Sequence, residues 1–184
     1  MRLVLASGSP RRRQLLEWAG LSPEVRPSDV DEHWVVGEDP ADAAERLARS
    51  KALGPDDAVL VAADTVVHVD GEPFGKPEGA NDAVAMLRRL SGRWHHVTTG
   101  VAVRSAQGVL TSFRVTTDVR FRALSDGEIA RYVATGEPLD KAGAYGIQGE
   151  GGGLVAEVRG DWTNVMGLPL EATLSALQAH GIAP

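Results

Sequence analysis

The first seventeen residues constrain the fold of this chain most, because they read as a strand, a tight turn and a helix in immediate succession. Residues 3–6 (LVLA) are apolar and of strand length, Ser7-Gly8-Ser9 supplies the turn, and Pro10 suits the first position of a helix that Gly20 ends. This is the first unit of an alternating α/β order that continues along the chain.

Three arginines occupy the first turn of that helix, where Ser9 is the expected N-cap. The helix dipole is positive at this end, so the positive charge of each of Arg11, Arg12 and Arg13 destabilises the helix by roughly 0.3 to 1 kcal/mol. A bound anion would resolve the conflict, because free backbone N–H groups, the hydroxyls of Ser7 and Ser9 and the arginine forks together suit a phosphate chain. The alternative is a solvated basic patch, and both interpretations stay open at this point.

Composition bounds the class of protein. With 184 residues, 43% of them hydrophobic and 24% charged, residues 1–184 are expected to form one globular domain, or two lobes that share a cleft. No apolar run reaches membrane-spanning length and the N-terminus does not read as a signal peptide, so we expect a soluble, cytoplasmic protein without a membrane partner. The absence of cysteine excludes disulfides, thiolate metal sites and a cysteine nucleophile. A net charge of −6 argues against a nucleic-acid partner, so a polyanionic ligand must meet a local basic cluster.

The remaining elements are predicted from hydrophobic periodicity and from the glycines and prolines that mark the ends of helices and strands. The expected strands span 24–30, 58–63, 66–69, 72–74, 97–103 and 109–122, the last two antiparallel. The expected helices run from 39–40 to about 53, from an Asn81 cap to about 90, from a Ser125–Glu128 capping box to 135, and from 168–169 to about 180. The tract Gly149–Gly153 is interpreted as a glycine-rich loop at a site or a close crossing.

Asp64 is the candidate catalytic group. It follows a continuous apolar run that predicts a strand buried on both faces, and ligands of open α/β sheets bind outside strand ends. Lys76, the acidic pair Asp31-Glu32 and the basic helix start supply the carboxylates and cations that Mg²⁺-assisted attack on phosphorus requires. The alternative is that Asp64 only caps the next turn.

Lysine is scarce: only Lys51, Lys76 and Lys141 stand among the 19 basic residues. In a chain that otherwise uses arginine, a lysine marks a place where a compact ammonium group is hard to replace by the planar guanidinium group of arginine. Glu137, Asp140 and Lys141 form a second mixed cluster, for which an exposed, self-neutralising loop is the alternative. His95 and His96 are adjacent, so on a strand they point to opposite faces, and we interpret them as structural or surface residues.

Six blocks cover nearly the whole chain in order: 7–12 (SGSPRR), 62–67 (AADTVV), 75–77 (GKP), 91–101 (SG and HVTTGV), 140–149 (DKAGAYGIQG) and 164–169 (NVMGLP). Together they resemble the Maf family of nucleoside triphosphate pyrophosphatases. The resemblance implies an elongated, two-lobed α/β fold with a mixed sheet, related to inosine triphosphatases, around a deep central cleft. It also implies hydrolysis of a nucleoside triphosphate to the monophosphate and pyrophosphate with Mg²⁺ or Mn²⁺, and it suggests a homodimer.

The same resemblance assigns roles to residues. Asp64 matches the general base, and Glu32 with Asp64 is the expected metal-ligand pair. The expected substrate-binding residues are Ser9, Arg11, Arg12, Lys51, Thr65, Lys76, Lys141 and Gln148.

Three positions resemble the group that acts on dTTP and UTP: Arg11, Thr65 and Gln148. The amide of Gln148 can both donate and accept a hydrogen bond toward a pyrimidine edge. One alternative is a 7-methyl-GTP pyrophosphatase, and another is a broad-specificity pyrophosphatase, because the glycine-rich segment after Gln148 would loosen the discrimination between bases. A third is a nucleotide-binding regulator of septum formation. The cellular role, cleaning of the nucleotide pool or control of division, stays open.

Overall fold

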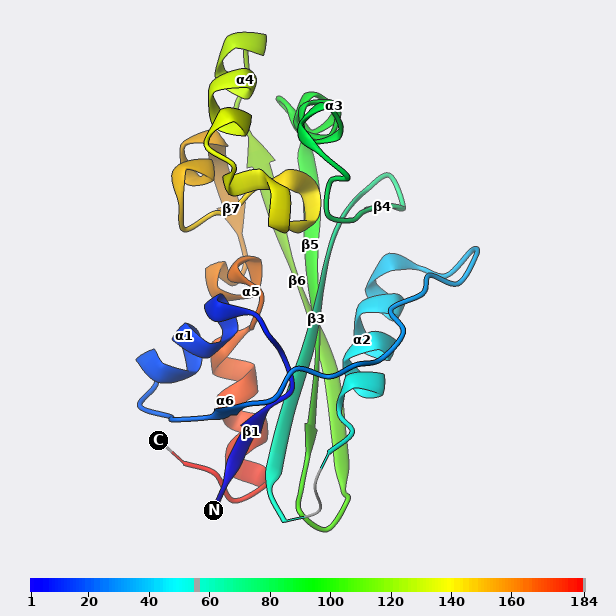
Figure 1. The fold of residues 1–184 in the computed structure, drawn as a ribbon, viewed down its shortest axis with the longest axis vertical. Helices are drawn as coiled ribbons and strands as arrows, with labels where there is room; N and C mark the ends of the chain where they lie inside the picture. Colours follow the sequence, from blue (N-terminus) through cyan, green and yellow to red (C-terminus); the bar gives the residue numbers. More distant parts are fainter. Residues whose placement is uncertain (55–56, 184) are drawn as a thin grey trace.

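Three long antiparallel strands run through the length of the molecule in the computed structural model, which describes residues 1–54 and 57–183 (Figure 1). They are β3 (Val59–Val69), β5 (Trp94–Arg104) and β6 (Leu110–Phe121). β5 pairs with β3 from His96 to Arg104 and with β6 from Trp94 to Arg104. The two ends of the elongated molecule therefore share one continuous sheet.

Shorter strands complete a mixed sheet of seven strands in the order β2-β1-β3-β5-β6-β7, with β4 paired to β3. β1 (Leu3–Leu5) runs parallel to β3 and to β2 (Glu24–Val25), whereas β4 (Glu72–Phe74) and β7 (Val155–Arg159) are antiparallel to their neighbours. The expected mixed-sheet α/β fold is confirmed. The strand expected over 24–30 is wrong in length, because Pro27 has no N–H to continue the ladder.

Six α-helices flank the sheet within the described residues: α1 (Pro10–Trp18), α2 (Pro40–Lys51), α3 (Ala80–Leu90), α4 (Asp126–Ala134), α5 (Trp162–Met166) and α6 (Leu170–Ala179). The N-cap of Ser9 and the Ser125–Glu128 capping box are confirmed. The Asn81 cap is wrong: Gly79 precedes the helix, and the carboxylate of Asp82 accepts from the Glu78 N–H instead. No helix in the described part of the chain is long and apolar enough to span a bilayer.

The strands bury different side chains on their two faces, because successive residues alternate. The core between the sheet and α2 is made mostly of alanines such as Ala48 and Ala62, together with Val4 and Leu60. The core on the other face includes Val61 and Ala63 with residues of α1 and α6, and it continues under α3 and α4. Figure 1 shows α2 on one side of the long strands and α1 and α6 on the other.

Asp64 lies in the middle of β3, and the expectation that a strand ends at this residue is wrong. Asp64 pairs with Gly100, and the pairing with β5 continues to His68. The strand persists because Val67 and Val69 add buried side chains beyond Asp64. The expected excursion of β3 into β4 is confirmed, with Asp70 and Gly71 at positive φ in the turn. The alternation places Asp64 on the α2 face and Thr65 on the α1 face.

Candidate active site

One cleft of about 620 Å³ opens beside the middle of β3, between the start of α1, the end of α2 and the 3-10 turns that follow α4. Its size falls within the roughly 300–1,000 Å³ of typical ligand sites. All of the residues predicted for the site line it: Ser9, Arg11, Arg12, Glu32, Lys51, Asp64, Thr65, Lys76, Lys141 and Gln148.

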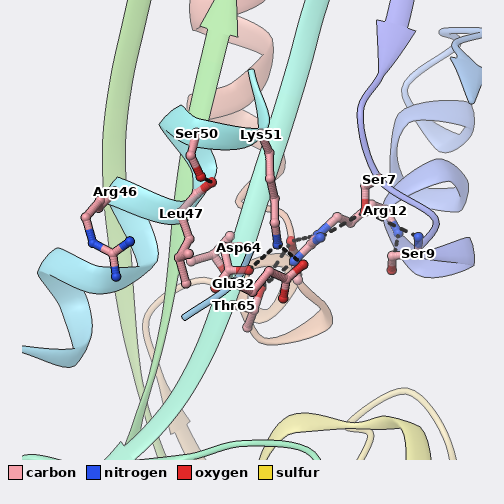
Figure 2. A network of polar contacts seen from close by, with 12 residues as sticks. Ser7, Ser9, Arg12, Glu32, Arg46, Leu47, Ser50, Lys51, Asp64 and Thr65 are labelled. Atoms are coloured by element: carbon pink, nitrogen blue, oxygen red, sulfur yellow. Dashed lines mark hydrogen bonds and ion pairs between the residues drawn. The ribbon is translucent and has the colours of Figure 1, made fainter. Parts of the chain in front are cut away.

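Lys51 joins the two acidic residues of the site. It lies at the end of α2, its side chain is only 8% exposed, and its Nζ donates to Asp64 Oδ1 at 2.5 Å and lies 2.8 Å from Glu32 Oε1 (Figure 2). A buried ammonium is tolerated when carboxylates pair with it. Asp64 Oδ2 receives no hydrogen bond from the described residues, and the Asp64 side chain stays 12% exposed. One carboxylate oxygen is therefore fixed and the other is open to the cleft.

Arg12 is held in one orientation by three uncharged acceptors. Its Nε donates to the Gly167 carbonyl at 2.8 Å, Nη1 to Ser7 Oγ at 2.9 Å and Nη2 to Thr65 Oγ1 at 3.0 Å. Burial lowers the pKa of Arg12, and the nearby carboxylate of Asp64 opposes that shift. No carboxylate of the described chain forms an ion pair with Arg12, so its positive charge is available to an anion in the cleft.

A chain of polar contacts that leads into the protein interior fixes Thr65 in the wall of the cleft. Thr65 Oγ1 lies 2.9 Å from Thr99 Oγ1, which donates to the Asn164 carbonyl at 3.1 Å. The amide of Asn164 in turn donates to the Val97 carbonyl and to Thr117 Oγ1. From the sequence, Thr99 and Asn164 were noted only as members of the blocks that resemble the Maf family, without a role of their own. The Gly167 carbonyl was missed entirely, because a backbone acceptor leaves no side-chain signal.

The remaining cations of the cleft differ in their partners. Arg11 Nη1 lies 3.9 Å from Asp140 Oδ2, and Lys141 Nζ donates to Asp140 Oδ1 at 2.6 Å and to the Glu137 carbonyl at 2.7 Å. Asp140 and Lys141 thus neutralise one another, as the alternative interpretation of this cluster has it, while binding of substrate by Lys141 stays a prediction. Lys76 is exposed and makes no hydrogen bond or ion pair with any described residue. Its ammonium is available to a ligand.

Gln148 is exposed at the rim of the cleft, followed by the glycine tract. That tract is not an irregular loop but a 3-10 turn, η3 (Glu150–Leu154), packed closely on Glu137. The expectation of a close crossing is thereby confirmed. His95 and His96 take opposite faces as predicted: His95 is buried 2.8 Å from the Tyr145 hydroxyl, and His96 pairs with Asp118 at the surface.

The carboxylates fit a divalent ion only with help from a ligand. Among the described residues no group of three or more acidic, histidine or cysteine side chains gathers in a metal-binding arrangement. Glu32 and Asp64 converge on one point, the Nζ of Lys51, and carboxylate oxygens are the ligands that Mg²⁺ and Mn²⁺ prefer. Mg²⁺ usually binds through one or two carboxylates and substrate phosphates, which is the number that this site offers.

Comparison with known proteins agrees with this geometry. A family model described as Maf-like protein matches residues 2–180. A dTTP/UTP pyrophosphatase of Anaeromyxobacter dehalogenans is 55% identical, over 98% of this chain and 94% of the relative. A dTTP/UTP pyrophosphatase of Chromobacterium violaceum is 51% identical, over 98% of this chain and 95% of the relative. The structure of a HAM1 protein from Coxiella burnetii covers 97% of this chain and 99% of its own with a TM-score of 0.53 and 16% identity, a likeness of fold.

Proposed function

This chain belongs to the Maf family, and we propose that it is a nucleoside triphosphate pyrophosphatase that converts dTTP and UTP to the monophosphate and pyrophosphate. The curated relatives, about half identical over almost the whole chain, support this activity. The observation that carries it is the cleft itself, which is lined by Asp64, with one carboxylate oxygen open, and by Arg12 and Lys76, two cations without an ion-pair partner among the described residues.

Asp64 is proposed as the general base. Its Oδ1 is fixed by Lys51, so Oδ2 is left to orient a water molecule and to take its proton as the water attacks the α-phosphorus. The attack is in line with the bond to the leaving pyrophosphate, and no covalent intermediate with the enzyme is required. The proton ends on Asp64 and the bond between the α-phosphorus and the bridging oxygen breaks.

The basic residues are proposed to bind the phosphate chain and to stabilise the leaving pyrophosphate. Arg12 is already oriented by Ser7, Thr65 and Gly167, so little reorganisation is needed when charge develops on the leaving group. Arg11, Lys51 and Lys76 also line the cleft and add positive charge to it.

Glu32 and Asp64 are the residues that would hold a divalent ion, completed by the phosphates. A bound Mg²⁺ or Mn²⁺ supplies charge neutralisation and Lewis-acid polarisation at phosphorus. We expect a chelator to abolish turnover and added Mg²⁺ or Mn²⁺ to restore it. We also expect Glu32→Gln to raise the metal concentration that gives half-maximal rate, and an unchanged requirement in this variant would remove Glu32 from the metal site.

Base choice is proposed to depend on Gln148, with Arg11 and Thr65 as the accompanying specificity positions. The exposed amide of Gln148 offers one donor group and one acceptor at the rim of the cleft, which suits the N–H and carbonyl edge of uracil or thymine. Gln148→Glu keeps the size but replaces the donor with a charged acceptor.

A panel of nucleoside triphosphates tests the function. UTP, dTTP, CTP, GTP and 7-methyl-GTP are incubated with the protein and Mg²⁺ or Mn²⁺, and both nucleotide and phosphate products are measured. We expect UTP and dTTP to give monophosphate and pyrophosphate in equal amounts with the highest kcat/KM. Preference for 7-methyl-GTP, or release of orthophosphate, would contradict the proposal.

The cytoplasm, where the free nucleotide pool lies, is the compartment that we propose. The homodimer stays a prediction, and sedimentation equilibrium is its direct test. Cleaning of the nucleotide pool stays a proposed role.

A further inference from the structure

The segment that carries Gln148 has few side chains of its own with which to hold a shape. Glycine stands at positions 146, 149, 151, 152 and 153, and glycine leaves a backbone more conformational freedom than any other residue. A base-reading amide on such a segment needs an external support, because each freely moving residue adds to the entropy lost when a ligand binds.

Glu137 provides that support after Gln148. Its Oε2 accepts the Glu150 N–H at 2.9 Å and its Oε1 accepts the Gly151 N–H at 3.1 Å. The Tyr132 hydroxyl, from the buried face of α4, donates to the same Oε1 at 2.8 Å. One carboxylate therefore receives three hydrogen bonds, two of them from consecutive backbone amides.

Tyr132 provides the support before Gln148. Its hydroxyl accepts the Gly146 N–H at 3.1 Å while it donates to Glu137. The backbone on both sides of Gln148 is thus fastened to one pair of side chains, which lie five residues apart at the end of α4 and the start of η1 (Glu137–Asp140).

The glycines allow this close approach. A Cβ on Gly151 would lie 2.5 Å from the Tyr132 hydroxyl oxygen, and a Cβ on Gly149 would overlap the carboxylate of Glu137. Gly149 and Gly151 are accordingly requirements of the packing against Glu137 and Tyr132, so these two glycines serve to hold the segment in place.

The protonation states agree with these contacts. Burial acts to raise the pKa of Glu137, but the hydrogen bonds from Gly151, Tyr132 and Glu150 outweigh it and hold the pKa below its ordinary value. Burial, with the adjacent Glu137 carboxylate, raises the pKa of Tyr132. At neutral pH Glu137 is an ionised acceptor and Tyr132 is a protonated donor.

We infer that Glu137 and Tyr132 are positioning residues that fasten the backbone on both sides of Gln148 and thereby set the selectivity for the base. The inference rests on the proposed function, since it concerns the substrate choice of the same site. Neither side chain is required to touch the substrate.

The decisive variant is Glu137→Gln, which keeps the size but brings an NH₂ group against backbone donors. Two quantities are measured in parallel: hydrogen exchange of the Gly146, Glu150 and Gly151 amides in the ligand-free protein, and the ratio of kcat/KM for UTP to that for GTP. We expect exchange of the Glu150 and Gly151 amides to accelerate by about 10-fold or more, as for a lost charged acceptor. The UTP to GTP ratio should fall by about 10-fold, mainly through KM for UTP.

Two further variants complete the test. Tyr132→Phe removes one hydroxyl, should accelerate exchange at Gly146 and should lower the same ratio, and it decides the question if Glu137→Gln does not fold. Glu150→Gln is the matched control: it removes a charge beside the segment, its carboxylate makes no hydrogen bond or ion pair with described residues, and its backbone N–H is kept. It should preserve both the exchange rates and the ratio.

The outcomes separate the inference from the proposed function. If the wild type hydrolyses UTP but Glu137→Gln and Tyr132→Phe keep the UTP to GTP ratio, or leave the amide exchange unchanged, the inference is overturned and the proposed function stands. If the wild type does not release pyrophosphate from UTP or dTTP, the proposed function fails, and with it the claim on base selectivity.

Discussion

At the scale of the residue, Asp64 is the group on which the proposed chemistry depends. Asp64→Asn keeps the size and a hydrogen-bonding oxygen but cannot take a proton, so we expect kcat to fall on the order of 100-fold or more with KM little changed. Asp57→Asn, which alters an exposed carboxylate paired with Arg2 and outside the cleft, is the control. Activity of Asp64→Asn within a few-fold of wild type would remove Asp64 from the role of base.

The lysines make a second prediction at this scale, because they differ in burial. Lys51 is enclosed between two carboxylates with its side chain 8% exposed, so the larger planar fork of arginine cannot occupy the same point. We expect Lys51→Arg to lose nearly as much activity as Lys51→Ala, about 100-fold, through displacement of Asp64. Lys76 is exposed, so the expectation from the scarcity of lysine is not extended to it: Lys76→Arg should retain activity within about 5-fold, since an exposed cation has room for the exchange. Activity of Lys51→Arg close to that of wild type would contradict this account.

Residue types alone predicted the basic residues of the site. The scarcity of lysine and the arginines at a positive helix end both pointed to positions that the structure brings into one cleft. The contact of Arg12 with the Gly167 carbonyl was out of reach, because 155 residues separate the two and a carbonyl has no sequence signature.

At the scale of the element, the packing of α2 on β5 sets the place of Lys51. Gly100 pairs with Asp64 across the strands, and a Cβ at Gly100 would overlap the α2 backbone at Ala44 and lie 2.5 Å from the Cα of Glu45. Gly100→Ala must push α2 away from the sheet, so we expect a loss of about 1–3 kcal/mol in the free energy of unfolding together with reduced turnover.

Denaturant unfolding measures the effect of Gly100→Ala. The matched control is Gly127→Ala in α4, where a Cβ meets only the far end of Arg131 at 3.8 Å and alanine favours the helix by about 0.5–1 kcal/mol. Equal stability of Gly100→Ala and wild type would show that α2 does not pack on β5 as described.

The same scale shows where sequence patterns sufficed. Caps are local, so the Ser9 and Ser125 signals located α1 and α4 correctly. Strand lengths depend on partners that are far away in the sequence. β3 continues past the polar Asp64-Thr65 pair because β5 offers matching residues, and β2 stops early where Pro27 cannot pair.

At the scale of the whole molecule, the buried His95 makes stability depend on pH. Burial, with His96 nearby, lowers the pKa of His95 from 6.5 to about 4. Between pH 6.5 and 4 this histidine takes up a proton in the unfolded state but not in the folded state, so the free energy of unfolding decreases as the pH falls through this range. Above pH 6.5 the ring is neutral in both states and the protein keeps its full stability. The free energy of unfolding is lower by about 3 kcal/mol once the pH is below both the folded and the unfolded pKa of His95.

Two measurements check the His95 prediction. NMR titration should place the pKa of the His95 ring near 4 in the folded protein. The free energy of unfolding should decline between pH 6.5 and 4. A His95 ring that titrates near 6.5 would contradict the burial that the structure gives it beside Tyr145.

Most of the order of strands and helices and the buried run before Asp64 could be read from the sequence, and they led to the α/β class, but β7 and α5 were not predicted. Length and composition left two lobes with a shared cleft as one of two possibilities, and only the resemblance selected it and gave the mixed sheet, because no local pattern reports that three strands run through both lobes.

Hydrolysis of UTP in water enriched in ¹⁸O tests the central claim most directly, since it reports which phosphorus is attacked. With Mg²⁺ or Mn²⁺ present, we expect one pyrophosphate for each UMP, with ¹⁸O in UMP and none in pyrophosphate, because the water oriented by Asp64 attacks the α-phosphorus. Label in pyrophosphate, or orthophosphate and UDP as the products, would contradict the account.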